Sequence, residues 1–292
     1  MSTNIASPAD AVLSARPRRS HTISWQRVLL YVILVGLLIA FLTPIYMVLA
    51  TAFKTESEVN LLDVWRLPQA LNFGSFVDAF NTLKPFLINS LIMAPVATIV
   101  SAVLGSINGY VLSKWYFRGA NIIFPLMLFG MFIPYQSILI PLFRSLQSLH
   151  LYGGLFGLTL THIVYGLPIT TLIFRNYYAE IPKEMIESGQ IDGADFFGIY
   201  LNLLFPLSIP AFVVVIIWQF TQIWNEYLFA VTLTSHDSWP ITVELAQLGQ
   251  GQAINYSIQM AGAFLTALPT LLVYIFLGRY FIRGLLAGSV KG

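Results

Sequence analysis

Amide, aromatic and carboxylate side chains gather between residues 218 and 227, inside an otherwise apolar part of the sequence. The members of this cluster are Trp218, Gln219, Gln222, Asn225, Glu226 and Tyr227. Side-chain amides exchange hydrogen bonds with hydroxyl groups, and aromatic rings offer flat apolar faces, so the combination suits a neutral sugar. A belt of aromatic residues at a membrane surface explains the same residues equally well. Under either interpretation, Glu226 is expected to be a gate or a helix-packing residue rather than a sugar ligand.

Tyr135 and Gln136 form a second candidate for a polar pathway. They follow Pro134 within an apolar segment. A proline in a membrane helix frees a backbone carbonyl, which neighbouring groups or water must satisfy. We therefore expect these two side chains to line a pathway as well.

A third stretch, residues 184–210, is polar and broken although it lies between two apolar segments. Its later half repeats apolar residues at the spacing of one helix face: Phe196, Ile199, Tyr200, Leu203 and Leu204. Asp195 precedes this face in the position of an N-cap, and Pro206 disfavours continuation of the helix. Pro182 opens an earlier helical stretch, and Gly193 permits a tight turn between the two. The sequence predicts two short helices that either dock into a partner's groove or lie at the membrane surface.

Long apolar segments must position these groups. The chain has 292 residues, of which 57% are hydrophobic and only 10% are charged, a composition that indicates a membrane protein. A bilayer core is crossed by roughly 20 apolar residues in one helix. The windows that qualify are Val28–Ala50, Phe86–Leu112, Ala120–Phe143, Gly153–Phe174, Leu207–Thr234 and Tyr256–Gly278. The expected fold is therefore all-α and polytopic, with six membrane-spanning helices.

The distribution of basic residues predicts the orientation of these helices. With both termini in the cytoplasm, eleven Lys and Arg residues lie inside and four lie outside, which agrees with the excess of positive charge on cytoplasmic loops. This orientation places a loop at about 179–206 in the cytoplasm and a segment at about 54–85 outside. Residues 1–24 are expected to be a disordered cytoplasmic terminus, followed by a single membrane domain over residues 25–292. The first window is too long for a cleaved signal.

Several classes of function are excluded by what the sequence lacks. It has no cysteine, and its four histidines show no metal-ligand spacing, so we expect no metal site. A net charge of +2 does not suggest nucleic acid. No phosphate-binding G-x-x-x-x-G-K-[ST] motif is present, so any ATP hydrolysis would belong to another polypeptide. No catalytic residues are expected, and the chain is not predicted to be an enzyme.

The polar loop carries a recognisable motif. Its residues Pro182-x-Glu184-Met185-x-Glu187-Ser188-Gly189-x-Ile191-Asp192-Gly193-Ala194, followed by Leu203-x-Phe205-Pro206, resemble the EAA loop of ABC-importer permeases. Ser188 and Gly189 stand where the motif has two alanines, so a small residue replaces a small one. Leu203 and Phe205 stand where it has isoleucine and leucine, so an apolar residue replaces an apolar one. The segments Phe53–Thr55, Trp224–Tyr227 and Tyr280–Gly292 are similar to binding-protein-dependent sugar permeases, in particular to the second permease of maltose-type transporters.

The resemblance implies the architecture of type I importer permeases, which is MetI-like. It also implies import of a neutral mono- or oligosaccharide or polyol across a bacterial or archaeal plasma membrane. Expected partners are a second, similar permease, an ATPase dimer that holds ATP and Mg, an extracytoplasmic sugar-binding protein and the lipid bilayer. The residues expected at the ATPase contact are Glu184, Glu187, Ser188, Gly189, Ile191, Asp192, Gly193, Ala194, Phe196 and Phe197. The alternative is an ion-gradient carrier that works as an oligomer, with Glu226 and His162 as its ionisable groups.

Overall fold

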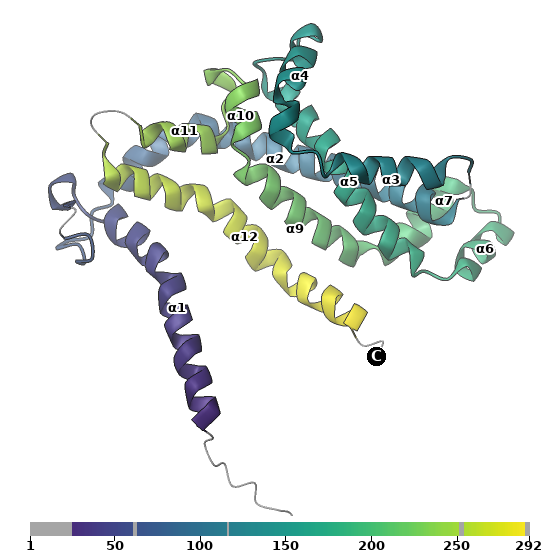
Figure 1. Cartoon of the computed structure of the whole chain (residues 1–292), viewed down its shortest axis with the longest axis horizontal. Helices are drawn as coiled ribbons and strands as arrows, with labels where there is room; N and C mark the ends of the chain where they lie inside the picture. Colours follow the sequence, from purple (N-terminus) through teal and green to yellow (C-terminus); the bar gives the residue numbers. More distant parts are fainter. Residues whose placement is uncertain (1–24, 61–62, 116, 251–253, 290–292) are drawn as a thin grey trace, which may run out of the picture. The chain divides into compact units, whose positions relative to one another are not determined.

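The computed structural model describes residues 25–60, 63–115, 117–250 and 254–289, and these residues are almost entirely helical (Figure 1). The helices are α1 Trp25–Ala52, η1 Glu56–Glu58, α2 Gly74–Lys114, α3 Ala120–Gly130, α4 Tyr135–Ser148, α5 Leu155–Ala179, α6 Lys183–Ile191, α7 Phe196–Ile199, η2 Tyr200–Leu204, α8 Phe205–Leu207, α9 Ile209–Asn225, α10 Leu228–Leu233, η3 His236–Ser238, α11 Ile241–Leu248 and α12 Tyr256–Ser289. Within the described ranges there is no β-strand, only an isolated bridge between Gly153 and Thr234. The predicted disordered terminus, residues 1–24, lies outside the described residues.

The chain divides into two units, Met1–Met47 and Val48–Gly292. The described part of the first unit consists of α1 residues that are mostly apolar and exposed, as expected of a helix that faces lipid. The second unit contains every other helix named above. The cavity and the polar loop described below both belong to this second unit.

Four of the described helices, α1, α2, α5 and α12, are long and apolar enough to cross a membrane. Two further spans result if each of two bent helix pairs counts as one, which gives up to six. The predicted count of six is therefore reached only with broken helices. The window Ala120–Phe143 is not one helix, because α3 and α4 meet at 101° across residues 131–134. Pro134 stands at the N-cap of α4, where it has no N–H with which to continue the preceding helix.

Two other predicted boundaries differ from the structure. α2 begins at Gly74 rather than at Phe86, because residues 74–85 are helical but too polar to belong to an apolar window. Asn72 holds this start, since its Oδ1 accepts from the Gly74 backbone N at 2.9 Å. The window Leu207–Thr234 is also divided, because α9 ends at Asn225 and α10 starts anew at Leu228.

The centre of the second unit is the pair α2 and α5, which pack at very short distance. A Cβ added at Gly105 would lie 2.2 Å from Thr170 Oγ1, and one at Gly109 would lie 2.7 Å from the Phe174 side chain. Only glycine allows this approach, as the Gly105-x-x-x-Gly109 spacing predicts. α9 and α12 pack against α2 and against each other (Figure 1).

α2 also holds the segment that links η3 to α11. Asn89 Nδ2 donates to the carbonyls of Asp237 and Trp239 at 3.1 and 3.0 Å. One residue further on, the Ser90 hydroxyl accepts from the backbone N of Ile241 at 2.8 Å. These bonds tie residues 237–241 to the first half of α2.

Candidate functional site

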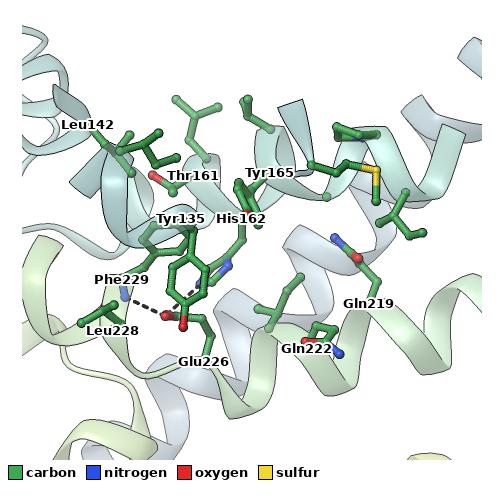
Figure 2. A pocket seen from close by; sticks show the side chains of 18 of the residues that line it. Tyr135, Leu142, Thr161, His162, Tyr165, Gln219, Gln222, Glu226, Leu228 and Phe229 are labelled. Atoms are coloured by element: carbon green, nitrogen blue, oxygen red, sulfur yellow. Dashed lines mark hydrogen bonds and ion pairs between the residues drawn. The ribbon is translucent and has the colours of Figure 1, made fainter. Parts of the chain in front are cut away.

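A cavity of about 950 Å³ opens between the α3–α4 break, α5, α9 and α10 (Figure 2). Its volume is at the upper end of the range of roughly 300–1,000 Å³ that is typical of small-molecule sites. The side chains that carry polar atoms or aromatic rings into its wall are Tyr135, Ser145, Thr161, His162, Tyr165, Trp218, Gln219, Gln222, Asn225, Glu226, Tyr227 and Phe229. Lys and Arg are absent from the described residues that line it.

The structure brings together seven of the eight residues that the sequence suggested for a pathway. Six of them, Trp218 to Tyr227, come from the end of α9 and the turn after it, and Tyr135 comes from the first turn of α4. Gln136 is exposed and does not line the cavity, because successive helix residues point in directions about 100° apart.

Glu226 is held by the helix that follows it. Its Oε1 accepts from the Phe229 backbone N at 2.7 Å, and its Oε2 accepts from the Ala230 backbone N at 3.1 Å. The carboxylate thereby caps the N-terminus of α10, where the helix dipole favours a negative charge. Its side chain is 16% exposed, and the Thr242 hydroxyl donates to its backbone carbonyl at 3.2 Å. Glu226 is thus a helix-packing residue, one of the two roles expected of it.

Four rings surround the capped end of α10. Phe229 lies edge-to-face with Tyr135, Tyr165 and His162, with centroid distances of 5.3, 5.5 and 6.1 Å. Tyr135 and Tyr165 also meet edge-to-face, at 6.4 Å. Through its bond to the backbone N of Phe229, Glu226 holds the backbone of the residue whose ring meets the other three.

Gln219 crosses the wall of the cavity where α9 approaches α5. A Cβ at Gly166 would lie 1.7 Å from Gln219 Nε2, so the amide occupies the space that a larger residue would fill. Gln219 is buried, whereas Gln222 and Asn225 are exposed to the open cavity. Asn225 donates to the Thr221 carbonyl of its own helix at 2.8 Å.

Sequence reasoning missed part of this site. Tyr165 and Phe229 were not expected to line a pathway, and His162 was named only as an ionisable group of the alternative carrier, yet all three line the cavity together with Tyr135 (Figure 2). For His162 the sequence contained one signal, an ionisable residue within an apolar window. Conversely, Trp224 lies beside the predicted cluster but is buried, and its Nε1 donates to the Thr266 carbonyl of α12 at 3.0 Å.

The polar loop has the predicted form of two short helices around a glycine turn, which confirms that prediction. α6 starts after Pro182, and the Asp195 side chain caps α7 by accepting from the Gly198 backbone N at 2.7 Å. Gly193 has a φ of +82°, in the left-handed region. The Ala194 N bonds the Gly189 carbonyl and the Gly193 N bonds the Gln190 carbonyl, which together form a Schellman C-cap.

Pro206 lies one residue before the end of the helical stretch Phe196–Leu207, close to where the prediction placed that end. It belongs to the short helix α8, which continues directly from η2. The π-helical turn η2 precedes it, and the chain bends only at Ser208, by 76°. A π turn and a proline are both common causes of such bends.

The loop exposes most of the residues proposed for the ATPase contact. Glu184, Glu187, Ser188, Ile191, Asp192, Gly193 and Phe197 are exposed, whereas Gly189, Ala194 and Phe196 are partly covered. Ile191 is 86% exposed and Phe197 is 60% exposed, an unusual state for apolar side chains on an acidic loop. The loop therefore presents apolar and acidic groups together.

A chain of hydroxyl groups fastens this loop to α2 and α5. Tyr200 OH donates to Ser106 Oγ at 3.0 Å, and Tyr178 OH donates to Ser208 Oγ at 3.0 Å. Ser106 Oγ and Tyr178 OH are 2.6 Å apart, and since the Tyr178 proton points to Ser208, Ser106 must be the donor between them. Ser208 in turn donates to the Phe205 carbonyl at 3.0 Å. All four side chains are buried, and such a chain polarises cooperatively.

Aromatic contacts strengthen the same attachment. The Tyr110 ring stacks on Phe196 at 4.8 Å and on Tyr200 at 6.1 Å, and Trp115 meets Phe196 at 5.4 Å. The Lys114 ammonium group donates to the Ile181 carbonyl just before α6. The loop is thus packed on the end of α2 through its apolar face, while its other face stays open.

Comparison with known proteins identifies the family. Residues 101–286 match the model of the binding-protein-dependent transport system inner membrane component. The chain belongs to this family. The matched region contains both the cavity and the polar loop, and the long apolar helices agree with a membrane-spanning permease.

Named permeases are similar over nearly their whole length. A probable ABC transporter permease of Pyrococcus horikoshii is 48% identical over 273 residues, which cover 92% of this chain and 99% of the relative. A xylose/arabinose import permease of Haloferax volcanii is 37% identical over 287 residues, covering 90% and 93%. An arabinooligosaccharides transport permease of Bacillus subtilis is 32% identical over 283 residues, covering 94% and 99%.

A solved structure shows the same fold. It is the crystal structure of a bacterial ABC transporter that imports the acidic polysaccharide alginate, with a TM-score of 0.75 and 20% sequence identity. The match covers 96% of this chain and the whole of that chain. The expected MetI-like architecture of this permease family is confirmed.

Proposed function

We propose that this permease is one translocation subunit of an ATP-driven importer of uncharged carbohydrates in a bacterial or archaeal plasma membrane. The observation that carries the proposal is the cavity between α4, α5, α9 and α10. It combines side-chain amides and hydroxyls with a cluster of aromatic rings, the usual partners of sugar hydroxyls and of the apolar faces of sugar rings.

The charge of the cavity favours an uncharged cargo. Among the described lining residues there is no Lys or Arg to pair with an anionic sugar, and the carboxylate of Glu226 is engaged with backbone N–H groups of α10. The names of relatives support a carbohydrate, since one imports xylose and arabinose and another transports arabinooligosaccharides.

The loop of α6 and α7 would transmit to the cavity the conformational change that ATP hydrolysis drives in the ATPase subunits. Its open face offers Glu184, Glu187, Ile191 and Phe197 to a groove on an ATPase subunit, which would bind ATP and Mg. On its other face the loop is fastened to α2 and α5. A push on the loop would therefore move the helices that line the cavity. To shift the population of inward- and outward-facing states, docking must favour one state by a few kcal/mol.

The assembly requires further chains and a defined orientation. A second permease of similar fold would cover the open side of the cavity, two ATPases would dock in the cytoplasm, and a sugar-binding protein would deliver cargo from outside. Both termini of this permease would lie in the cytoplasm, as the excess of Lys and Arg on that side favours. A bacterial alginate ABC transporter of similar fold has been solved in complex with its periplasmic protein, which supports a partner of that kind.

Co-purification tests the proposal. The tagged permease is extracted from its native host in a mild detergent, and the eluate is analysed for accompanying chains and for ATP hydrolysis with the binding protein and neutral sugars. We expect a second membrane chain, a soluble ATPase, and hydrolysis that a neutral sugar stimulates. Recovery of the permease alone, in a detergent that preserves a known importer, would overturn the proposal.

An ion-gradient carrier is the second candidate, because His162 and Glu226 form an ionisable pair inside an apolar segment, 3.9 Å apart. Such a carrier would lose uptake when a proton uncoupler is added, even with ATP present. An ATP-driven importer in proteoliposomes would keep its uptake under the same conditions.

A further inference from the structure

His162 carries a buried nitrogen that nothing in the cavity satisfies. Of the described residues that line the cavity, it alone has a fully buried side-chain nitrogen or oxygen without a hydrogen-bond partner, namely Nε2. The side chain is only 5% exposed. Leaving such a group unpaired costs free energy, and a native structure normally retains one only for a reason such as binding.

The nearest acceptor is too far for a direct bond. His162 Nε2 lies 3.9 Å from Glu226 Oε2, beyond the usual limit of about 3.2 Å for a hydrogen bond. Oε2 already accepts from the Ala230 backbone N, but each carboxylate oxygen can accept twice. His162 Nε2 and Glu226 Oε2 therefore face each other across a gap, and each atom can still form one more hydrogen bond.

A hydroxyl group matches the hydrogen-bonding capacity on the two sides of this gap. An oxygen about 2.8 Å from both atoms would make its two bonds at an angle of about 90°, within the range that a hydroxyl tolerates. It would donate to the Glu226 carboxylate and accept from the imidazole N–H, so both of its capacities would be used. A methyl group or a second carboxylate in the same place would leave one or both protein groups unpaired.

The surroundings suit a carbohydrate that carries this hydroxyl. Phe229, Tyr135 and Tyr165 lie around the pair and offer ring faces and edges to the carbon skeleton (Figure 2). Gln219 and Gln222 lie seven and four residues before Glu226, at spacings that place them on a similar side of α9. Further hydroxyls of the same molecule would meet these amides.

We infer that His162 and Glu226 together bind one hydroxyl group of the transported carbohydrate, so that this subunit itself carries a specificity-determining site. The inference rests on the proposed function and extends it, because it assigns the recognition of one hydroxyl to two named side chains. Glu226 has a double role, since it binds the hydroxyl and also positions Phe229 through the cap of α10.

The test uses the complete importer in proteoliposomes, with both permeases, the ATPases and the binding protein. The probes are D-xylose, L-arabinose, maltose and glycerol, with D-glucuronate as the anionic comparison. For each neutral sugar that drives uptake, the monodeoxy derivatives are measured as well. The variants are His162→Phe, which keeps a ring but removes Nε2, and His162→Gln, which keeps a polar group. Gln136→Ala is the matched control, because Gln136 is exposed and outside the cavity.

We expect the unmodified importer to transport one monodeoxy derivative roughly 10- to 100-fold less well than its parent sugar, the penalty for leaving buried polar groups unpaired. His162→Phe should reduce this penalty several-fold, because Glu226 alone then binds the hydroxyl, and should leave the penalties for the other derivatives unchanged. His162→Gln should retain part of the discrimination, and Gln136→Ala all of it. D-glucuronate should not be transported.

The outcomes separate the two proposals. Because every measurement uses the same binding protein, its own selectivity cancels when a variant is compared with the unmodified importer. Ratios in both His162 variants equal to those of the unmodified importer would show that the gap holds only water, and would overturn the inference while sugar-driven uptake stands. Failure of every neutral sugar to stimulate ATP hydrolysis would instead overturn the proposed function. If His162→Phe does not assemble, unchanged ratios in His162→Gln still decide against the inference.

Discussion

The cavity and the base of the α6–α7 loop are both polar regions inside an apolar bundle, but they satisfy their polar groups differently. At the loop base, the hydroxyls of Tyr200, Ser106, Tyr178 and Ser208 form a continuous chain of donors and acceptors. In the cavity, His162 Nε2 has no partner and Glu226 keeps capacity for another bond. A closed network stiffens an attachment, whereas an open one is prepared to receive a ligand. The contrast predicts that changes at the loop affect coupling and that changes at the cavity affect selectivity.

The largest effect is expected from Gly193→Val. The residue has a φ of +82°, and a β-branched side chain is strongly disfavoured there although no neighbouring atom would obstruct its Cβ. A left-handed backbone costs an ordinary residue about 1–2 kcal/mol, and valine more, so the turn between α6 and α7 should open. We expect sugar uptake to fall at least tenfold while the protein still reaches the membrane.

Gly193→Asn is the matched control, because asparagine tolerates the left-handed region. It should retain most of the uptake. Transport and ATP hydrolysis are measured together in proteoliposomes, with membrane content checked by immunoblot. Full uptake by a stably inserted Gly193→Val variant would show that the geometry of this turn does not matter for coupling.

Tyr178→Phe removes the middle of the hydroxyl chain. Ser106 loses an acceptor and Ser208 loses a donor, both in a buried site, and each unsatisfied group costs about 1–3 kcal/mol. We expect a lower melting temperature and more ATP hydrolysed per sugar transported. The selectivity between sugars should not change.

Tyr177→Phe serves as the comparison for that experiment. The Tyr177 hydroxyl makes a single bond, to the Leu207 carbonyl at 2.7 Å, outside the chain. Its loss should cost less stability and leave the ratio of ATP to sugar unaltered. Equal effects of the two substitutions would show that the hydroxyl chain contributes no more to coupling than an isolated bond does.

Glu226→Gln should have a moderate effect at the cavity. An amide retains one oxygen to accept from the α10 N-terminus but loses the charge that the helix dipole favours, a difference of about 0.3–1 kcal/mol. We expect slower uptake and altered preference between sugars, with an unchanged ratio of ATP to sugar. Uptake should be independent of a proton gradient in both the unmodified protein and the variant, as measured with an uncoupler. If uptake by the unmodified protein depends on the gradient and the substitution abolishes that dependence, the ion-gradient carrier is favoured.

The smallest effect is expected from Glu244→Gln, a change outside both regions. Burial on α11 raises the pKa of the Glu244 carboxyl, an effect that His236 partly offsets. An acid whose pKa is higher in the folded state makes folding less favourable as the pH rises from its unfolded pKa of about 4.3 through its folded pKa. Glu244→Gln should therefore raise the melting temperature slightly at pH 7 and not at pH 4. The amount of sugar taken up per ATP should not change. This variant therefore shows the effect of altered stability alone, against which the loop and cavity variants are compared.

The loop was predictable from the sequence because its signals are local. An N-cap at Asp195, a proline before α6 and a glycine that must turn each act within a few residues, and the structure places all three as expected. The bend at Ser208 was not predictable in the same way. It depends on a π-helical turn at Tyr200–Leu204, and nothing in the apolar spacing of that face distinguishes a π turn from an α turn.

The cavity was predictable only in part. The cluster at residues 218–227 is evident from composition, but nothing in the sequence joins His162, Tyr165 and Phe229 to it. Their proximity depends on how α5 packs against α9 and on the 101° break between α3 and α4. Packing of this kind joins residues that are far apart in the chain, and periodicity within one segment carries no information about it.

The length of α2 has a consequence for how fast the permease can switch. In the first half of α2, Asn89 and Ser90 hold residues 237–241, and Ser106 holds the base of the loop about 25 Å further along the same helix. Because both attachments are made to one helix, residues 237–241 and the base of the loop should move together. Fluorescent reporters at Ser238 and at Glu187 should therefore relax with the same rate constant when ATP is added. Segments attached to separate helices would relax with different rate constants.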